Sequence, residues 1–105
     1  MLVRLTHLNF SSEDKDDVKR IYNEEIVPIV RQQKGIVNIM LLEPVKEGDD
    51  YISVTQWEDK ADADAYEASG TYRQLVDKVK DKYTKKPELR TYTTEVVPSM
   101  SAALN

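Results

Sequence analysis

The chain has 105 residues, and its 19 acidic and 15 basic side chains are mixed along the sequence and give a net charge of −4. This length suits one domain, and the slightly acidic balance provides no positive field for phosphates, which argues against a nucleic-acid partner. Cysteine is absent, which excludes disulfides, thiolate metal sites and a cysteine nucleophile, and no apolar run approaches the roughly 18 residues of a membrane span.

The first residues, Met1 to Arg4, enter a strand-like pattern at once. They lack the charged segment, apolar stretch and small-residue cleavage site of a secretory signal. The absence of cysteine also fits a reducing compartment. We therefore expect a cytoplasmic protein without membrane attachment.

The first ten residues alternate in character, as a strand does. One face of this strand carries Val3, Leu5, His7 and Asn9, and the other carries Leu2, Arg4, Thr6, Leu8 and Phe10.

Ser11 or Ser12 can cap a helix that follows this strand, because a hydroxyl satisfies a free amide at the helix start. The helix is predicted to run to about Gln33, with apolar residues at three- and four-residue spacing. Gly35 provides its left-handed stop. Pro28 lies inside the helix and removes one backbone hydrogen bond, which predicts a kink near Glu24 or an early end to regular helix.

Two strands and a polar turn follow. Residues Ile36 to Leu42 are β-branched and apolar on both faces, and Tyr51 to Trp57 alternate in type. The short turn between them predicts a hairpin.

The second helical region begins at Asp59, which can cap a short alanine-rich helix through Ala68. Residues 69–71 interrupt it, and a helical stripe resumes as far as Tyr83. A fourth strand is predicted from Leu89 to Val97 because of its many β-forming residues. We expect one domain over residues 1–97 and a small, polar tail over residues 98–105.

The resulting order, βαββαβ, predicts an α+β ferredoxin-like fold with a four-stranded antiparallel sheet and both helices on one face. The other face of the sheet would stay uncovered. We expect strand one to turn Leu2, Leu8 and Phe10 toward that bare face, and strand two is apolar on both sides. A second copy of the chain covers such a face most simply, so a homodimer is predicted.

Three stretches carry a resemblance to a known family. They are Tyr22-Asn23-Glu24-Glu25-Ile26-Val27-Pro28, followed by Gln33-Lys34-Gly35; Leu41-Leu42-Glu43-Pro44; and Ser53-Val54-Thr55-Gln56-Trp57-Glu58-Asp59, leading to Tyr66, Ser69 and Tyr72. In these three stretches, and over roughly residues 2–97 as a whole, the chain resembles the antibiotic biosynthesis monooxygenase-like proteins of the dimeric α+β barrel superfamily. The resemblance implies a barrel dimer. It also implies a pocket between helices and sheet in which oxygen reacts with an aromatic substrate or haem, without a separate organic cofactor.

The haem-degrading branch of this family needs an asparagine on strand one, and a tryptophan and a histidine in the second helix. An ungapped placement puts His7, Tyr66 and Val76 at those positions. Loss of the histidine removes the iron ligand. The sequence therefore argues against haem degradation, unless His7 itself binds the iron.

The quinone-forming monooxygenases need fewer specific residues than the haem-degrading branch. They need a dry aromatic pocket, a base, and hydrogen-bond donors for a developing oxyanion. His7 is the single histidine, and a histidine side chain ordinarily exchanges its proton near neutral pH, which makes it the natural base. Asn9 shares its face and can hold a substrate oxygen. The alternatives are a strand histidine bonded to a neighbour in the sheet and an asparagine that binds backbone.

Glu25 falls on the apolar face of the first helix at 100° per residue, where a carboxylate is costly unless it is paired or faces a polar cavity. It can point into the pocket and orient His7. Alternatively, Pro28 rotates the helix so that Glu25 reaches solvent or an arginine. The substrate-binding candidates are aromatic residues that are equally ordinary in a core, namely Tyr22, Trp57, Tyr66 and Tyr72.

Other chemistry finds little support. The three glycines form no phosphate-binding loop. With one histidine and no cysteine, we expect neither a metal nor a cofactor. Two hypotheses remain: a cofactor-independent monooxygenase that oxidises a small phenol or hydroquinone, and a non-catalytic or stress-related barrel that binds a small aromatic or apolar ligand. Fold alone does not choose between them.

Overall fold

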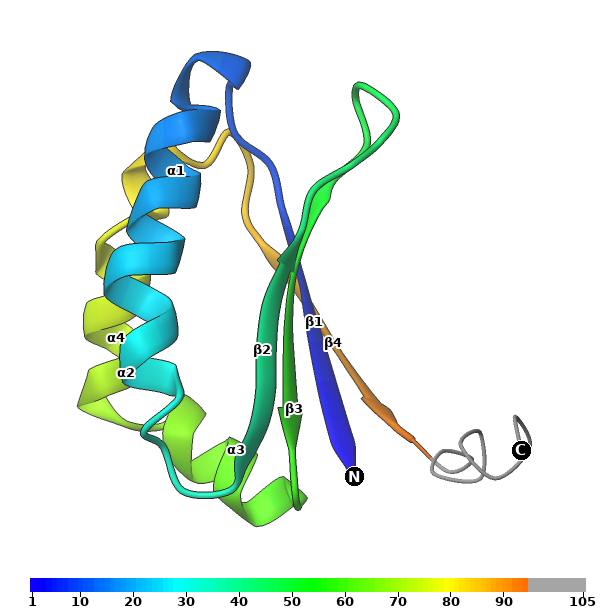
Figure 1. The fold of residues 1–105 in the computed structure, drawn as a ribbon, viewed down its shortest axis with the longest axis vertical. Helices are drawn as coiled ribbons and strands as arrows, with labels where there is room; N and C mark the ends of the chain where they lie inside the picture. Colours follow the sequence, from blue (N-terminus) through cyan, green and yellow to red (C-terminus); the bar gives the residue numbers. More distant parts are fainter. Residues whose placement is uncertain (95–105) are drawn as a thin grey trace, which may run out of the picture.

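The computed structural model describes residues 1–94, and these form the predicted ferredoxin-like arrangement. Strands β1 (Leu2–Leu8), β2 (Ile36–Leu42), β3 (Tyr51–Trp57) and β4 (Glu88–Thr93) make one sheet in the order β2-β3-β1-β4. Every pairing is antiparallel. All helices lie on one side of this sheet (Figure 1). The domain end predicted at residue 97 and the tail at 98–105 lie outside the described residues.

The first helical segment is continuous but changes its winding. A 3-10 turn η1 (Ser12–Asp14) leads into α1 (Lys15–Ile21), a π-helical turn η2 (Tyr22–Ile26) and α2 (Val27–Val30). The predicted cap is confirmed, because the Ser11 hydroxyl accepts from the Glu13 amide at 3.3 Å. Pro28 has no amide hydrogen, so the wide π turn, in which the Val27 amide bonds Tyr22, stands where the kink was predicted.

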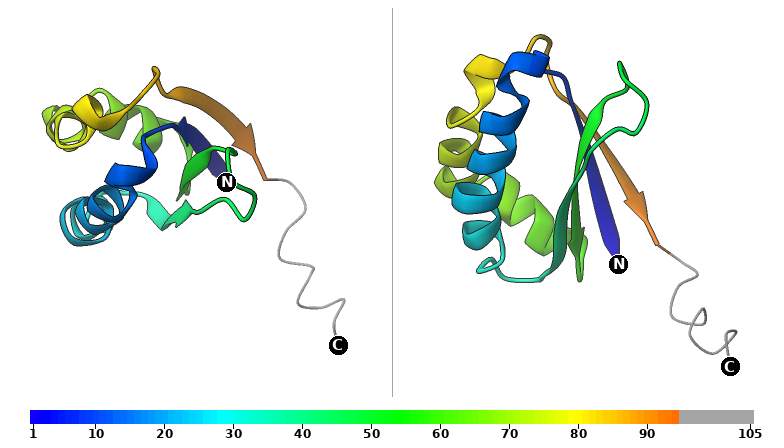
Figure 2. Two further views of the ribbon diagram at one scale, coloured as in Figure 1. Left: turned by 90° about the horizontal axis from the view of Figure 1, so that it is seen from above. Right: turned by 45° about the horizontal axis from the view of Figure 1, so that its top comes forward.

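The second helical region is broken as predicted. Asp59 caps α3 (Lys60–Glu67), Ser69 caps α4 (Gly70–Asp77), and a 3-10 turn η3 (Lys80–Lys82) follows. Both views in Figure 2 place α4 beside α1. Lys82 reaches Asp17 of α1 at 2.9 Å, which ties the two helical regions together.

Gly35 shows why this position needs glycine. Its φ is +82°, and a Cβ built on it would stand 2.6 Å from the Cβ of Asp62, below any ordinary contact distance. The predicted left-handed stop before β2 is confirmed, and the close approach also lets the start of β2 pack against α3.

The core lies between helices and sheet. It includes Trp57 and Val18, each only 1% exposed, together with Tyr22, Val30 and Leu75. β4 is exposed along its whole length, so it forms an open edge of the sheet.

The sequence-based prediction of which face of β1 packs under the helices is wrong. Leu2 and Leu8 are 6% and 5% exposed and lie under the helices rather than on the bare face. Phe10 lies beyond the strand end, where it pairs with Tyr83. The predicted alternation of side chains along β1 is correct. Because β1 has apolar side chains on both faces, its sequence does not indicate which face packs against the helices.

In residues 1–94 no helix or strand covers the opposite face of the sheet (Figure 1). Side chains that alternate with the buried set lie there, including Met40 and Leu42, which are 41% and 44% exposed. The apolar members of this bare face are Val3, Leu5, Met40, Leu42, Ile52, Val54 and Tyr92.

Candidate functional site

A cavity of about 110 Å³ lies between the sheet and the second helical region. One buried water needs only about 10–15 Å³ on the same scale, so the space accommodates a single small ring. Its polar and aromatic lining comes from Arg4, Thr6, Tyr22, Ser53, Thr55, Trp57, Tyr66, Glu67, Tyr72 and Tyr83, and its apolar lining from Leu8, Ile26, Val30, Ile39, Leu75, Val76, Val79 and Leu89. Leu89, on the edge strand β4, is 40% exposed and marks where the cavity meets solvent.

Three aromatic rings form a continuous wall. Trp57 of β3 packs on Tyr66 of α3 with ring centroids 5.3 Å apart, and Tyr66 meets Tyr72 of α4 edge to face at the same distance. The indole nitrogen of Trp57 donates to the Thr55 hydroxyl at 3.0 Å, so it is already satisfied. This wall holds three separate elements in one arrangement.

Tyr22 is fixed by two hydrogen bonds. Its hydroxyl donates to the Met40 carbonyl at 3.1 Å, which uses its only proton, and the Ser53 hydroxyl at 2.7 Å therefore donates to it. Burial raises the pKa of Tyr22 to about 12, and the bond from Ser53 offsets part of that effect.

The other cavity tyrosines share this dry environment. Burial raises the pKa of Tyr83 to about 12, raises the pKa of Tyr66 further, and raises that of Tyr72. Their phenol groups therefore stay protonated at neutral pH, and they can donate hydrogen bonds to a ligand but cannot take up its proton.

Arg4 is a positively charged residue in the cavity lining. Its guanidinium donates to the Ala63 carbonyl at 2.9 Å and pairs with Asp64 at 2.5 Å and Glu67 at 2.7 Å, all on α3. Its side chain is only 11% exposed, and its Nε–H is buried with no hydrogen-bond partner in the part of the chain that the structure describes. An unmatched buried donor costs about 1–3 kcal/mol, so this N–H calls for an explanation.

The predicted substrate-binding residues Tyr22, Trp57, Tyr66 and Tyr72 all line this one cavity. The predicted catalytic residues do not. His7 and Asn9 lie on the opposite face of β1, because they alternate with Thr6 and Leu8, which line the cavity.

His7 and Asn9 converge instead on Asp50, at the start of β3. His7 Nδ1 lies 3.2 Å from Asp50 Oδ2, and the Asn9 side-chain amide donates to Asp50 Oδ1 at 2.7 Å. These two bonds lower the pKa of Asp50, the Asn9 contact more than that of His7. The cluster borders two more open hollows of about 460 and 540 Å³ and not the cavity between sheet and helices.

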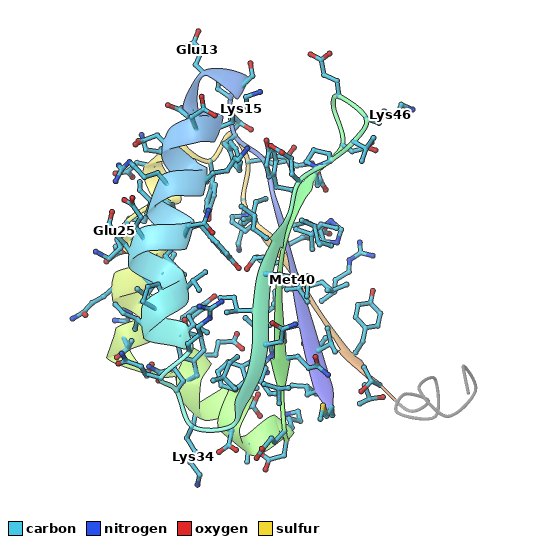
Figure 3. The ribbon with its side chains drawn as sticks, in the orientation of Figure 1. Glu13, Lys15, Glu25, Lys34, Met40 and Lys46 are labelled. Atoms are coloured by element: carbon cyan, nitrogen blue, oxygen red, sulfur yellow. The ribbon has the colours of Figure 1, made fainter. Side chains whose placement is uncertain are left out.

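Glu25 also lies away from the cavity. Figure 3 shows it on the outer side of the helix, and its carboxylate binds Lys78 at 3.1 Å and approaches Arg20 at 3.8 Å. The alternative in which the helix turns Glu25 toward solvent and a cation is therefore correct, because the π-helical turn that contains it shifts the 100° spacing on which the pocket-facing prediction relied.

Sequence reasoning missed Arg4, Glu67 and Tyr83 as cavity residues. A signal was present for Arg4, since a charged side chain alternates there with Leu2, Thr6 and Leu8 on one strand face. Tyr83 was placed in the helical stripe of the second region but was given no pocket role, and Glu67 gave no comparable signal because it is one of many charged residues in that region.

The residues present do not suit a haem held by histidine. The cavity lining includes no histidine, and it does include Val76, the residue that the ungapped placement above puts at the iron-ligand position of the haem-degrading branch. Among residues 1–94, no group of three or more histidine, cysteine, aspartate or glutamate side chains is arranged to hold a metal ion. In the same residues, no helix is long and apolar enough to cross a membrane.

Comparison with known proteins finds a family match. The family model for antibiotic biosynthesis monooxygenase matches residues 1–78. A search of curated protein sequences returns no match.

Solved structures share the fold at low sequence identity. A proposed antibiotic biosynthesis monooxygenase from Deinococcus radiodurans has a TM-score of 0.80 and 15% identity, covering 92% of this chain and 95% of its own. Another from Nitrosomonas europaea has a TM-score of 0.77 and 14% identity, covering 91% and 100%. The haem degrader MhuD of Mycobacterium tuberculosis, solved with two haems in its active site, has a TM-score of 0.77 and 15% identity, covering 91% and 97%.

Proposed function

The chain belongs to the antibiotic biosynthesis monooxygenase family, and from this premise we propose that it oxidises a small phenol or hydroquinone with molecular oxygen, without a cofactor. The reaction takes place in the cavity between sheet and helices. The residues proposed to bind the substrate are Tyr22, Trp57, Tyr66 and Tyr72.

The observation that carries this proposal is the aromatic wall along a small cavity between sheet and helices. A phenol ring fits against the rings of Trp57, Tyr66 and Tyr72, and the neutral tyrosine hydroxyls offer hydrogen-bond donors to its oxygens. In a phenol, the C–H opposite the hydroxyl and the hydroxyl itself both become C=O; in a hydroquinone, both hydroxyls become C=O and a neighbouring ring C–H becomes C–OH. In each case one atom of O₂ enters the product, and the other leaves as water with the two hydrogens that the substrate loses.

His7, Asn9 and Glu25 have no part in this proposal, because none of them lines the cavity. The chain must instead favour the ionised substrate by charge, and among residues 1–94 Arg4 is the cationic side chain that lines the cavity.

A second candidate function is non-catalytic binding of a small aromatic ligand. The favouring observation is that the lining offers no imidazole, and that its carboxylate, Glu67, is bound to Arg4 at 2.7 Å. Such a cavity binds a ring without supplying a free base.

Oxygen uptake with a panel of hydroquinones and anthrone-like phenols tests the enzyme proposal. The informative variant is Val76→Phe, which fills the cavity, and its matched control is Val45→Phe on the fully exposed hairpin. We expect uptake by the wild type and by Val45→Phe, and loss of uptake in a folded Val76→Phe. Ligand binding without any uptake supports the second candidate, and equal uptake by both variants contradicts a reaction in this cavity.

We also propose that the protein works as a cytoplasmic homodimer. Support comes from the bare sheet face, where seven apolar side chains lie beside the polar groups of β3 and β4 with no element of residues 1–94 over them. Apolar surface of this kind favours burial against a second copy.

A further inference from the structure

Tyr83 lines the cavity but has no role in the function proposed above. Its backbone is held where the second helical region returns to the sheet. It forms an antiparallel bridge with Phe10, and the next amide, that of Thr84, donates to the Asn9 carbonyl at 2.8 Å. The position of this tyrosine beside the carboxyl end of β1 is therefore set by backbone contacts and not by a bond to its hydroxyl.

The hydroxyl of Tyr83 is enclosed but unpaired. Burial is the main cause that raises its pKa, and no hydrogen bond contributes to that rise. In residues 1–94, Arg4 Nε is the side-chain polar atom that is fully buried without a partner, so the Tyr83 oxygen, which has no partner there either, keeps accessible surface. An oxygen that is enclosed by protein and still accessible faces the cavity that its residue lines.

Two of the aromatic lining residues have no free proton for a ligand. The Tyr22 hydroxyl donates to the Met40 carbonyl, and the Trp57 indole nitrogen donates to the Thr55 hydroxyl. The aromatic donors that remain for a ligand are therefore the hydroxyls of the other lining tyrosines.

Tyr66 and Tyr83 lie toward opposite ends of the cavity. Tyr66 packs against Trp57, which pairs with Leu2 at the start of β1, whereas Tyr83 lies beyond the end of that strand. Tyr72 lies between them, because it meets Tyr66 edge to face and its phenol also acts on that of Tyr83. A ring that rests on this wall with one oxygen near Tyr66 thus directs its opposite side toward Tyr83.

The end of the cavity near Tyr83 also has apolar lining. Leu8 lies at the end of β1, and Val79 precedes η3, four residues before Tyr83. A ligand oxygen that enters this end gives up its water, and an oxygen left without a donor there carries a cost of desolvation. The Tyr83 hydroxyl removes that cost for an oxygen and offers nothing to a hydrocarbon group.

We propose that Tyr83 is a further substrate-binding residue, whose hydroxyl donates a hydrogen bond to a second oxygen of the ligand, across the ring from the oxygen near Tyr66. This inference rests on the proposed function and narrows its substrate class. The preferred ligand is a single ring with an oxygen at both ends, as in a hydroquinone, and not a phenol with one oxygen. Tyr83 acts through binding alone, because its phenol stays protonated at neutral pH.

The test compares two ligands that differ in one group. 4-Methoxyphenol has an acceptor oxygen opposite its hydroxyl, and 4-ethylphenol has a CH₂ group in place of that oxygen. Both are uncharged at neutral pH. Trp57 is the single tryptophan and lines the cavity, so the NMR signal of its indole N–H follows binding and gives a dissociation constant for each ligand.

The measured quantity is the ratio of the two dissociation constants, compared between the wild type and Tyr83→Phe. The two ligands differ in hydration, but that difference is the same for every variant and cancels in the comparison. We expect the preference for 4-methoxyphenol over 4-ethylphenol to fall by about threefold to tenfold in Tyr83→Phe, the effect of one hydrogen bond. The matched control is Tyr51→Phe, whose lost hydroxyl bonds Glu43 outside the cavity lining, and it should keep the wild-type ratio.

An unchanged ratio in Tyr83→Phe, or an equal fall in Tyr51→Phe, overturns the role of Tyr83 and leaves the proposed function standing. Absence of any change in the indole signal with both ligands overturns the role of Tyr83 and counts against the proposed function as well. If Tyr83→Phe does not fold, nuclear Overhauser effects in the wild type decide. Bound 4-methoxyphenol should show them to the rings of both Tyr66 and Tyr83, and contacts to Tyr66 without Tyr83 overturn the proposal.

Discussion

Alkaline pH should unfold this protein by ionising the tyrosines that line its cavity. A tyrosine whose folded-state pKa lies above its unfolded value contributes stability that is present below the unfolded pKa and is lost as the pH rises through the folded pKa. The ordinary value is 10.0, and burial raises the pKa of Tyr22 and of Tyr83 to about 12. The vulnerable range therefore lies between pH 10 and about 12.

The magnitude follows from the size of these shifts. One pKa unit corresponds to about 1.36 kcal/mol, so Tyr22 and Tyr83 each contribute about 2–3 kcal/mol that is lost across this range. The sum is comparable with the whole stability of a small domain, about 5–15 kcal/mol.

Urea unfolding at a series of pH values measures this loss, and tyrosinate absorbance in the native state reports how many phenols have ionised. We expect native-state ionisation of the cavity tyrosines to be delayed until the chain unfolds. Tyr22→Phe should reduce the alkaline loss by about 2–3 kcal/mol, because it removes one buried phenol. Ionisation of all tyrosines near pH 10 without a fall in stability would refute the dry cavity.

Three further outcomes follow from the geometry. Gly35→Ala should lower the free energy of unfolding by about 1–3 kcal/mol, because its φ is +82° and the new Cβ would meet Asp62. Gly48→Ala should cost less, because Gly48 has a φ of +97° but no atom within 4 Å of the new Cβ. Urea unfolding measures both changes, and a larger loss in Gly48→Ala would contradict this prediction. Val54→Asp on the bare face should shift the proposed dimer toward monomer in sedimentation, and an unchanged mass at all concentrations would exclude that face as the interface. His7→Ala should leave oxygen uptake at the wild-type rate, because its imidazole lies outside the cavity; a large loss would restore it as the base.

Much of the fold was readable from local signals. The Ser11 and Asp59 caps, the Gly35 stop and the apolar hairpin strands placed the elements within a few residues, because capping, turn geometry and side-chain alternation act over short distances. The family resemblance is also confirmed over residues 1–78. The same patterns also predicted the aromatic residues of the cavity, because large rings on the buried faces of neighbouring elements pack against one another.

Local sequence patterns predict which side chains share a face of a strand or helix, whereas the direction in which that face points depends on how the elements pack. Alternation grouped His7 with Asn9 and Arg4 with Thr6, but β1 is apolar on both sides, so only the packing of the helices assigned Arg4 to the cavity and His7 to the bare face. The π-helical turn likewise moved Glu25 outward to Lys78. A strand or helix fixes the relative order of its side chains locally, whereas the side that becomes buried depends on contacts with residues far along the chain.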